Sequence, residues 1–419
     1  MDNPAPAPHV WRMSYDSDIL IAGGGLNGTT LALALTAGGF NVTLVDPRAT
    51  ETRAARDFDG RSYAMSVASC RVLKALDIWP ALSDDAQPIL DIKVSDGRVG
   101  QGPSPLFLAF DHAEIEEGPM GHMVEDRHLR PTLLDAVAAR KITHHAGVAI
   151  CDHTTDAGGV TATFDTGDSH RTRLLIGCDG KNSAIGARVG IKRTGWGYDQ
   201  TSLVCAVTHE KPHNGTAHQL FLEAGPLAIL PLSQNRASIV WTERTARAEA
   251  IAHLDDEGYL DILRPRLCDM LVAIYLVVQR GSFPRARAIA NDFIADRVAL
   301  VGDAAHAVHP IAGQGLNAGL KDVAALAEVL TDAARRGEDI GRHEVLQRYQ
   351  TWRRFDVMSL AVATDSFNRL FSNDNTLLRA ARDIGLGTVN ALPGLRRRFI
   401  REAAGLTGDL PRLAQGKPL

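Results

Sequence analysis

A glycine-rich turn near the start of the chain constrains the possible folds more than any other feature. Residues 18–22 form a short apolar run typical of a buried strand, and residues 26–37, rich in Ala, Leu and Thr, predict a helix. Gly23, Gly25 and Gly28 have the spacing GxGxxG. In this spacing the first glycine makes a tight turn, the second lets the backbone approach a pyrophosphate, and the third lets the helix pack against the strand. The helix N-terminus would then point its N–H groups at phosphate.

The residues that follow complete a βαβ unit. The helix is expected to stop at Gly38-Gly39, and residues 42–45 predict a second strand that ends at Asp46. A carboxylate in this place can accept hydrogen bonds from ribose hydroxyls. Glycine-rich turns are common, but strand, helix, second strand and acid follow one another in the required order, which favours nucleotide binding over coincidence. These residues leave open whether the nucleotide is NAD or FAD.

A second motif far downstream distinguishes the two nucleotides. The apolar residues 298–301 predict a strand that leads into Gly302-Asp303, and Pro310 precedes a glycine-rich turn, Gly313-Gln314-Gly315-Leu316-Asn317, that opens a helix. A carboxylate at a strand end can hold a polyol such as a ribityl chain. A helix N-terminus offers N–H donors to the flavin edge on which negative charge accumulates during reduction. NAD has neither a ribityl chain nor such an edge, so the motif indicates FAD.

The order of predicted elements indicates an α/β protein with a discontinuous first domain. A chain of 419 residues exceeds one compact core, so two or three domains are expected. Short strands recur with turn signals between residues 202 and 241, inside the α/β segments, and the chain is mainly helical after residue 301. The expected ranges are 15–80, 119–190 and 282–345 for a dinucleotide-binding domain, 81–118 and 191–281 for a β-sheet domain, and 346–419 for a helical region.

Charge and cysteine content argue against several kinds of partner. The net charge of -4 and the pI of about 6.4 leave no footprint for nucleic acid. The five cysteines have no CxxC spacing, which argues against a disulfide framework or a zinc site. His306 and His309 could suggest a metal pair, but no third ligand stands at a suitable spacing, so no metal is predicted. We expect a cytoplasmic protein; peripheral attachment to the inner membrane stays an open alternative.

Several segments resemble a known family. Gly23, Gly25 and Gly28, with Asp179-Gly180, Gly302-Asp303 and the Gly313 to Asn317 turn, are similar to the class A FAD-dependent aromatic hydroxylases, the group of p-hydroxybenzoate hydroxylase. More narrowly, the chain resembles the ubiquinone-biosynthesis hydroxylases. The segments that carry this narrower resemblance are Asp59-Gly60-Arg61 and residues 121–127, 225–232 and 302–317. The resemblance runs from about residue 18 to the C-terminal helices.

The resemblance implies a Rossmann-like FAD-binding domain of the glutathione-reductase type, an inserted β-sheet substrate domain and a C-terminal helical region. It also implies a role for individual residues. Gly23, Gly25 and Gly28 would face the pyrophosphate, Asp46 the adenosine ribose, Arg61 the phosphate or ribityl region, and Asp303 the ribityl chain. Arg127 would sit near the flavin, the backbone of Gly313, Gly315, Leu316 and Asn317 would cradle its ring, and Pro310 would lie where oxygen adds. Asp179 is linked to NAD(P)H use in the family, and could equally cap a helix beginning near Asn182.

The function implied by the resemblance is that of an FAD-dependent monooxygenase. NAD(P)H would reduce FAD, and O2 would then add to give a flavin C4a-hydroperoxide that hydroxylates a phenol ring. Because the chain has one GxGxxG, NAD(P)H would bind transiently and not in a second nucleotide-binding domain. A polyprenylated phenol lies in a bilayer, so the protein would have to reach a membrane surface or a ubiquinone-biosynthesis complex. Residues 358–400, apolar among basic residues, could make that contact or pack on the protein. The alternatives are a soluble phenol as substrate and a non-catalytic flavin-binding subunit.

Overall fold

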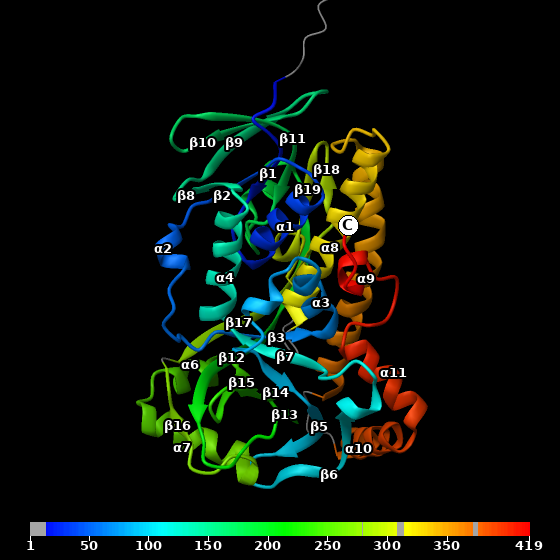
Figure 1. The fold of residues 1–419 in the computed structure, drawn as a ribbon. Coiled ribbons are helices and arrows are strands. Elements are labelled where there is room, and N and C mark those ends of the chain that lie inside the picture. Colours follow the sequence, from blue (N-terminus) through cyan, green and yellow to red (C-terminus); the bar gives the residue numbers. More distant parts are fainter. Residues whose placement is uncertain (1–13, 279, 308–313, 372–375) are drawn as a thin grey trace, which may run out of the picture.

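Two large β-sheets occupy opposite ends of the molecule, with a small sheet between them (Figure 1). The computed structural model describes residues 14–278, 280–307, 314–371 and 376–419. The first sheet has the order β18-β19-β11-β1-β2-β8, and the second has the order β20-β17-β12-β15-β14-β13-β5-β6. The small sheet has the order β3-β7-β4. The predicted α/β class is confirmed.

The first sheet has a parallel centre because short apolar segments alternate with helices. β1 (Ser17–Ala22) pairs in parallel with β2 (Val42–Asp46) on one side and with β11 (Ser169–Gly177) on the other. β8 (Thr143–Ala146) and β19 (Val298–Leu300) continue the sheet, also in parallel. The side chains of Ile19, Leu20 and Ile21 are fully buried, as expected for a parallel strand covered on both faces.

Helices pack on this sheet, and the first of them is the predicted one. α1 (Leu26–Ala37) has the predicted bounds and contacts α4 (Asp126–Ala139) and α8 (Gln314–Arg335). α9 (His343–Phe371) packs along α8. The other elements of this half are α2 (Thr50–Arg53), α3 (Val67–Ala75), α5 (Ala184–Arg188), β9 (Ile150–Thr155), β10 (Val160–Phe164), β18 (Ile294–Ala295) and the C-terminal 3-10 helix Arg412–Gln415.

Two helices cover one face of the second sheet, and part of its other face borders a cavity. Along β15 (Arg236–Arg244), Ala237, Ile239 and Trp241 belong to a core with α6 (Thr245–Ala252) and α7 (Asp256–Leu267). Ser238 and Val240 alternate with them and point the other way, into a cavity. The remaining strands are β5 (Asp91–Arg98), β6 (Gly102–Asp111), β12 (Arg193–Thr208), β13 (Thr216–Leu222), β14 (Gly225–Leu232), β16 (Tyr275–Leu276), β17 (Gly281–Ala290) and β20 (His306–Ala307).

Two long strands join the halves of the molecule. β12 and β17 pair from Arg193↔Ala290 to Val204↔Gly281, so their ribbon runs from the first sheet's side into the second sheet. β17 therefore lies in the second sheet, although residues 282–290 fall within the range 282–345 that we assign to the dinucleotide-binding domain. The proposed domain borders stay a prediction. The small sheet, β3 (Ser62–Ser66), β7 (Gly121–Glu125) and β4 (Gln87–Ile89), adds a second connection.

The C-terminal helices lie against the far edge of the second sheet. α10 (Thr376–Ala391) packs on β6 and β5, and α11 (Pro393–Ala403) follows it. The ring of Phe371 lies 4.1 Å from that of Phe221, centre to centre, and Ile400 is fully buried in the same cluster. Packing thus accounts for part of the apolar content of this region. Among the described residues, no helix is long and apolar enough to cross a membrane.

Candidate active site

A cavity of about 1000 Å³ lies between the carboxyl ends of the first sheet's strands and the open face of the second sheet. Most of the predicted cofactor-binding residues line it, although they are far apart in the sequence. The predicted residues in its wall are Gly23, Gly25, Asp46, Arg61, Asp179, Asp303, Gly315 and Leu316. Gly28, Arg127 and Asn317 are not among the residues that line it. Pro310 and Gly313 lie outside the described residues, so their predicted roles stay predictions.

The glycine-rich turn leaves space where a phosphate would have to approach. A Cβ on Gly28 would lie 1.9 Å from the carbonyl oxygen of Gly23, and a Cβ on Gly23 would lie 2.4 Å from that of Cys178. A Cβ on Gly25, in contrast, would meet no atom within 4 Å. Gly25 is the N-cap residue of α1 and has no side chain that could cap the helix, and the first turn of α1 contains no acidic residue. Within the described part of the chain, no side chain caps the first N–H groups of α1, so these groups can bind an anion from the cavity.

Asp46 holds the turn from the neighbouring strand. Its carboxylate accepts hydrogen bonds from the backbone N–H of Gly24, at 2.7 Å, and of Arg48, at 2.8 Å. The guanidinium of Arg53 lies 3.6 Å from the same carboxylate, and Arg53 has a pKa lowered by burial despite that neighbour. Since each carboxylate oxygen has a second lone pair, Asp46 can still accept from a ribose hydroxyl in the cavity.

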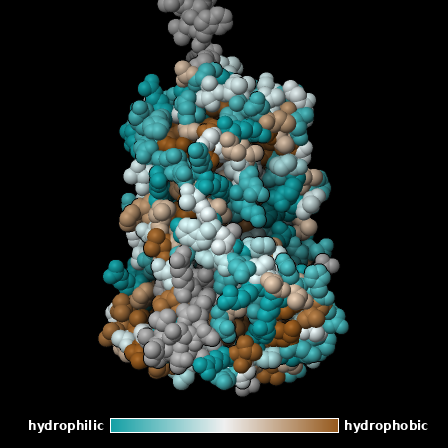
Figure 2. Space-filling model, turned by 180° about the vertical axis from the view of Figure 1, so that it is seen from behind, coloured by the Kyte–Doolittle hydropathy of each residue, from teal (hydrophilic) through white to brown (hydrophobic). Residues whose placement is uncertain are grey.

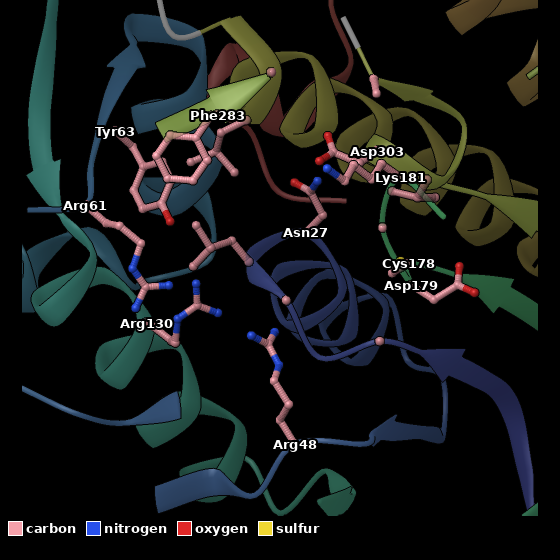
Figure 3. A pocket seen from close by; sticks show the side chains of 18 of the residues that line it. Asn27, Arg48, Arg61, Tyr63, Arg130, Cys178, Asp179, Lys181, Phe283 and Asp303 are labelled. Atoms are coloured by element: carbon pink, nitrogen blue, oxygen red, sulfur yellow. The ribbon is translucent and has the colours of Figure 1, made fainter. Parts of the chain in front are cut away.

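Three arginines gather beside the N-terminal end of α1. Figure 3 shows Arg48, Arg61 and Arg130 with their guanidinium groups pointing into the same part of the cavity. Arg61 and Arg130 both pair with Asp126, at 3.1 and 2.9 Å, which fixes their positions. The Nη1 of Arg130 is buried and has no hydrogen-bond partner among the described residues. Such a group fits a phosphate oxygen.

Sequence reasoning did not single out Arg130, and chose Arg127 one turn earlier. Arg127 donates to Glu125 at 2.8 Å, and its guanidinium lies 5.2 Å from the ring centre of Phe58. Arg236 of the second sheet lies 4.6 Å from the same ring and also pairs with Glu125, at 2.7 Å. Arg127 thus takes part in a contact between the two halves of the molecule. Its predicted place near the flavin stays a prediction. Arg130 follows Arg127 by three residues, about one turn of α4, and this spacing is the sequence signal that could have pointed to Arg130.

The Asp303 turn faces the cavity opposite the three arginines (Figure 3). Gly302 has φ +63°, a conformation that favours glycine, and a Cβ there would collide with the side chain of Asn27. Burial raises the pKa of Asp303, although the nearby His306 and Arg193 act in the opposite direction. Arg193 also donates to the carbonyl oxygens of Asp303, at 2.9 Å, and of Lys181, at 2.7 Å. One half-buried arginine therefore holds two walls of the cavity together.

A buried ion cluster supports the same turn from below. The carboxylate of Asp322, on α8, accepts from the backbone N–H of Gly302 at 3.0 Å, from His306 at 2.5 Å and from Arg353 at 2.8 Å. Burial opposes ionisation of Asp322, but His306 and Arg353 outweigh it, so the pKa lies below its usual value. His306 is thus engaged in a structural pair. Sequence reasoning missed Asp322 and Arg353 because no local motif joins them to the turn.

Asn317 and Asp179 have well-defined structural partners. The amide of Asn317 accepts from the backbone N–H of Ser66 at 2.9 Å and from the hydroxyl of Ser69 at 2.7 Å, which fixes the start of α8. Asp179 accepts from the N–H of Ile185 at 3.0 Å, in the first turn of α5, whose N-cap residue is Ser183. Its other carboxylate oxygen, Oδ1, is buried and has no partner among the described residues. The predicted link between Asp179 and NAD(P)H stays a prediction.

The second sheet provides the opposite, mainly apolar wall of the cavity. One row across the sheet joins Val204, Val240, Ala228 and Gln219, which are in register on adjacent strands. An open apolar face joined to a phosphate-binding face fits a dinucleotide with a flat ring, held beside an apolar ligand. The glycine cradle, the two helix N-termini of α1 and α8 and the unpartnered Arg130 Nη1 all fit FAD.

Comparison with known proteins agrees with this geometry. The family model described as "FAD binding domain" matches residues 16–363. The chain is 42% identical to the ubiquinone hydroxylase UbiL of Rhodospirillum rubrum, over 99% of this chain and 96% of that protein. It is 33% identical to the 3-demethoxyubiquinol 3-hydroxylase of Escherichia coli, over 93% of this chain and 99% of that protein. It is 30% identical to the ubiquinone biosynthesis monooxygenase COQ6 of Rattus norvegicus, over 96% and 94%.

Solved structures show the same fold at lower identity. The p-nitrophenol 4-monooxygenase PnpA of Pseudomonas putida superposes with a TM-score of 0.77, over 93% of this chain and 98% of that chain, at 18% identity. PqsL, a probable FAD-dependent monooxygenase of Pseudomonas aeruginosa, has a TM-score of 0.70 over 87% of this chain and 98% of that chain, at 21% identity. The chain therefore belongs to the family of FAD-dependent monooxygenases that contains the ubiquinone-biosynthesis hydroxylases.

Proposed function

We propose that the protein hydroxylates the aromatic ring of a polyprenylated phenol in ubiquinone biosynthesis, with NAD(P)H as transient reductant and O2 as the source of the inserted oxygen. The observation that carries this proposal is that one cavity joins a dinucleotide-binding wall to an apolar wall. The named relatives support it, because their printed names place them in ubiquinone hydroxylation and they match the chain over nearly its whole length.

The residues of the first wall would hold the cofactor. Gly25 and the N-terminus of α1 would receive the pyrophosphate, with charge from Arg48, Arg61 and Arg130. Asp46 would accept from the adenosine ribose, and Asp303 from the ribityl chain. The backbone of Gly315, Leu316 and Asn317, at the N-terminus of α8, would face the flavin ring. When bound, FAD supplies the electron transfer and the oxygen activation.

The residues of the second wall would place the ring and keep water away. The row Val204, Val240 and Ala228 offers a flat apolar surface to an aromatic ring and the first part of a prenyl chain. Water that reaches an activated oxygen species breaks it down without hydroxylation, so an apolar wall protects the reaction. Because the cofactor would carry the chemistry, we expect no separate acid–base pair among the described residues that line the cavity.

Mass spectrometry of quinone intermediates tests the proposal. A strain without the gene should accumulate a precursor that lacks one hydroxyl, and the position of that hydroxyl names the ring carbon. Normal ubiquinone in a strain without paralogues would reject the assignment. NAD(P)H oxidation by the purified holoenzyme, compared for prenylated and soluble phenols, separates the alternative of a soluble substrate. A bound flavin that NAD(P)H cannot reduce under any of these conditions would favour the non-catalytic subunit.

We further propose that α10 and α11 bring the protein to an anionic lipid surface. Ile384 is 62% exposed, and Leu392, Leu395 and Phe399 are also exposed. Arg397, Arg398 and Arg401 are exposed on α11. Figure 2 shows apolar side chains gathered at the end of the molecule that holds the second sheet. Apolar side chains beside arginines are typical of helices that lie in a lipid interface.

Vesicle sedimentation tests the lipid contact. The holoenzyme should sediment with phosphatidylcholine–phosphatidylglycerol vesicles more than with pure phosphatidylcholine vesicles. The double variant Leu395→Ser with Phe399→Ser should lose this binding. The control is Tyr275→Ser on β16, because Tyr275 is 62% exposed and β16 pairs with β12, whereas α10 packs on β5 and β6 at the other edge of the sheet. Equal sedimentation of all three proteins would refute the assignment of α11 and would leave a partner complex as the route to the substrate.

A further inference from the structure

The apolar wall of the cavity contains one charged side chain. Among the described lining residues that the second sheet contributes, Arg285 is the one that carries a charge. It lies on β17, two residues after Phe283, so both side chains belong to the same face of the strand. Phe283 is labelled in the close view of the cavity (Figure 3). The wall is otherwise made of aliphatic residues, prolines, serines and one glutamine.

Arg285 is held in place by a residue of the same wall. Its Nε donates a hydrogen bond to the hydroxyl of Ser202, on the adjacent strand β12. Ser202 is in register with Phe283, so it shares their face of the sheet. Both Arg285, at 5% exposure, and Ser202, at 3%, are buried. Burial lowers the pKa of Arg285 to about 10, so the guanidinium stays charged at neutral pH.

The guanidinium of Arg285 lines the cavity, where it can donate a hydrogen bond to a ligand oxygen with anionic character. Hydrogen bonds between charged groups are about twice as strong as those between neutral groups. A phenol has such an oxygen, and its pKa is close to 10 in water, as in tyrosine. A cation within about 4 to 6 Å lowers the pKa of an acid by about 1 to 3 units. The phenol proton would leave to solvent, and the oxygen would stay bound to Arg285.

We infer that Arg285 binds the phenolic oxygen of the aromatic substrate and thereby orients the ring, with Ser202 as a positioning residue for the guanidinium. The inference rests on the proposed hydroxylation of a phenol and deepens it. A fixed oxygen determines which ring carbon faces the first wall of the cavity, where the cofactor would lie. A bound phenolate also pushes electron density into the ring carbons next to and opposite the oxygen, which an electrophilic oxygen atom attacks.

Binding of two small probes to the FAD-loaded enzyme tests this inference. The probes are 2-prenylphenol and its methyl ether, 2-prenylanisole, which has the same ring and prenyl group but no ionisable oxygen. Binding is measured by the change in the flavin absorption spectrum, and ionisation of bound 2-prenylphenol by its phenolate absorption, at pH values from neutral to alkaline. The wild-type enzyme should prefer the phenol, and the bound phenol should ionise about 1 to 3 pH units below the free phenol.

The variants are chosen to keep the volume of the side chain. Arg285→Met should bind 2-prenylphenol about 10- to 100-fold more weakly, as expected for loss of a hydrogen bond to a charged group. It should bind 2-prenylanisole as before, and ionisation of the bound phenol should return to the value in water. Arg285→Lys should restore part of the preference. The matched control is Arg287→Met, because Arg287 is buried on the same strand but stacks on Trp196, at 4.8 Å, outside the cavity lining.

The FAD content of each variant shows whether it has folded. An Arg285→Met enzyme with normal FAD content and an unchanged preference for the phenol would overturn the inference. Equal binding of both probes by the wild-type enzyme would do the same. The deletion strain described above tests the proposed function separately, since a phenol-binding Arg285 in a strain with normal ubiquinone would show that the substrate is a different phenol.

Discussion

Replacement of Asp322 by Asn should destabilise the protein far more than any replacement of a surface acid on the same helix. Asp322 is fully buried and accepts hydrogen bonds from Gly302, His306 and Arg353. Removing one partner of a buried ion pair leaves an uncompensated buried charge, which costs about 3 to 5 kcal/mol. Arg353, whose side chain is 2% exposed, would keep its ion pair with Asp356, at 2.5 Å, whose side chain is 34% exposed and therefore compensates the buried charge less well.

Urea titration of the holoenzyme at neutral pH measures this loss as a fall in the free energy of unfolding. The pKa of Asp322 is lowered in the folded state, so its stabilisation is fully present at pH values above the unfolded pKa of about 3.9. It is lost as the pH falls through the lower folded pKa. Neutral pH therefore reveals the whole effect.

The matched control is Asp332→Asn, also on α8. Asp332 pairs with Arg412 at 2.5 Å, but its side chain is 37% exposed, and exposed pairs contribute about 0 to 1 kcal/mol. The double variant Asp322→Asn with Arg353→Met should recover part of the loss, because it removes the unpaired cation. An equal effect of Asp322→Asn and Asp332→Asn would refute the argument from burial. Because Asp322 holds the Gly302 turn, Asp322→Asn should also weaken FAD binding.

Three further predictions concern the cofactor wall and the response to pH. Gly25→Ala should fold, since its Cβ meets no protein atom within 4 Å, but it should bind FAD more weakly, since that Cβ would occupy the space left for the phosphate. Gly28→Ala should fail to fold normally, since its Cβ would lie 1.9 Å from a carbonyl oxygen. Circular dichroism measures folding and flavin titration measures FAD binding, and equal behaviour of the two variants would contradict the packing argument. Arg193→Met should loosen the Asp303 turn and lower FAD affinity about 10-fold or more, measured by flavin release, while normal affinity would show that the turn holds without it. Burial lowers the pKa of His122 and of His218 to about 4. The unfolded chain therefore binds protons below pH about 6.5 that the folded chain does not, and urea titrations should show that the free energy of unfolding falls from pH 6.5 towards 4. This fall should be shallower in His122→Gln and in His218→Gln.

Local patterns determined the first half of the cofactor site. The strand, glycine turn, helix and second strand from residue 17 to Asp46 follow from a short apolar run, glycine spacing and a helical segment, and α1 has the predicted bounds. These features act over a few residues, so they can be recognised without the rest of the chain. The same holds for the strand that leads into Gly302-Asp303. The sequence therefore sufficed for the α/β class, the nucleotide and the family.

The tertiary structure decided which charged side chains meet at the cavity. Arg130 replaces Arg127 in the lining because the helical rotation of α4 turns Arg127 towards Glu125 and Phe58. Asp322 and Arg353 lie under the Gly302 turn only because α8 and α9 pack there. Such contacts join residues far apart in the sequence, and no local pattern records them.

The second sheet makes the same distinction. Alternating strands between residues 202 and 241 predicted a β-sheet, but not which of its faces would be open. The helices α6 and α7 bury one face, and packing against the first half leaves part of the other face to the cavity. Only that choice places Arg285 in an apolar wall beside the cofactor side. The sequence by itself determined the chemistry of the cofactor, and the packing of the two halves determined what can be presented to it.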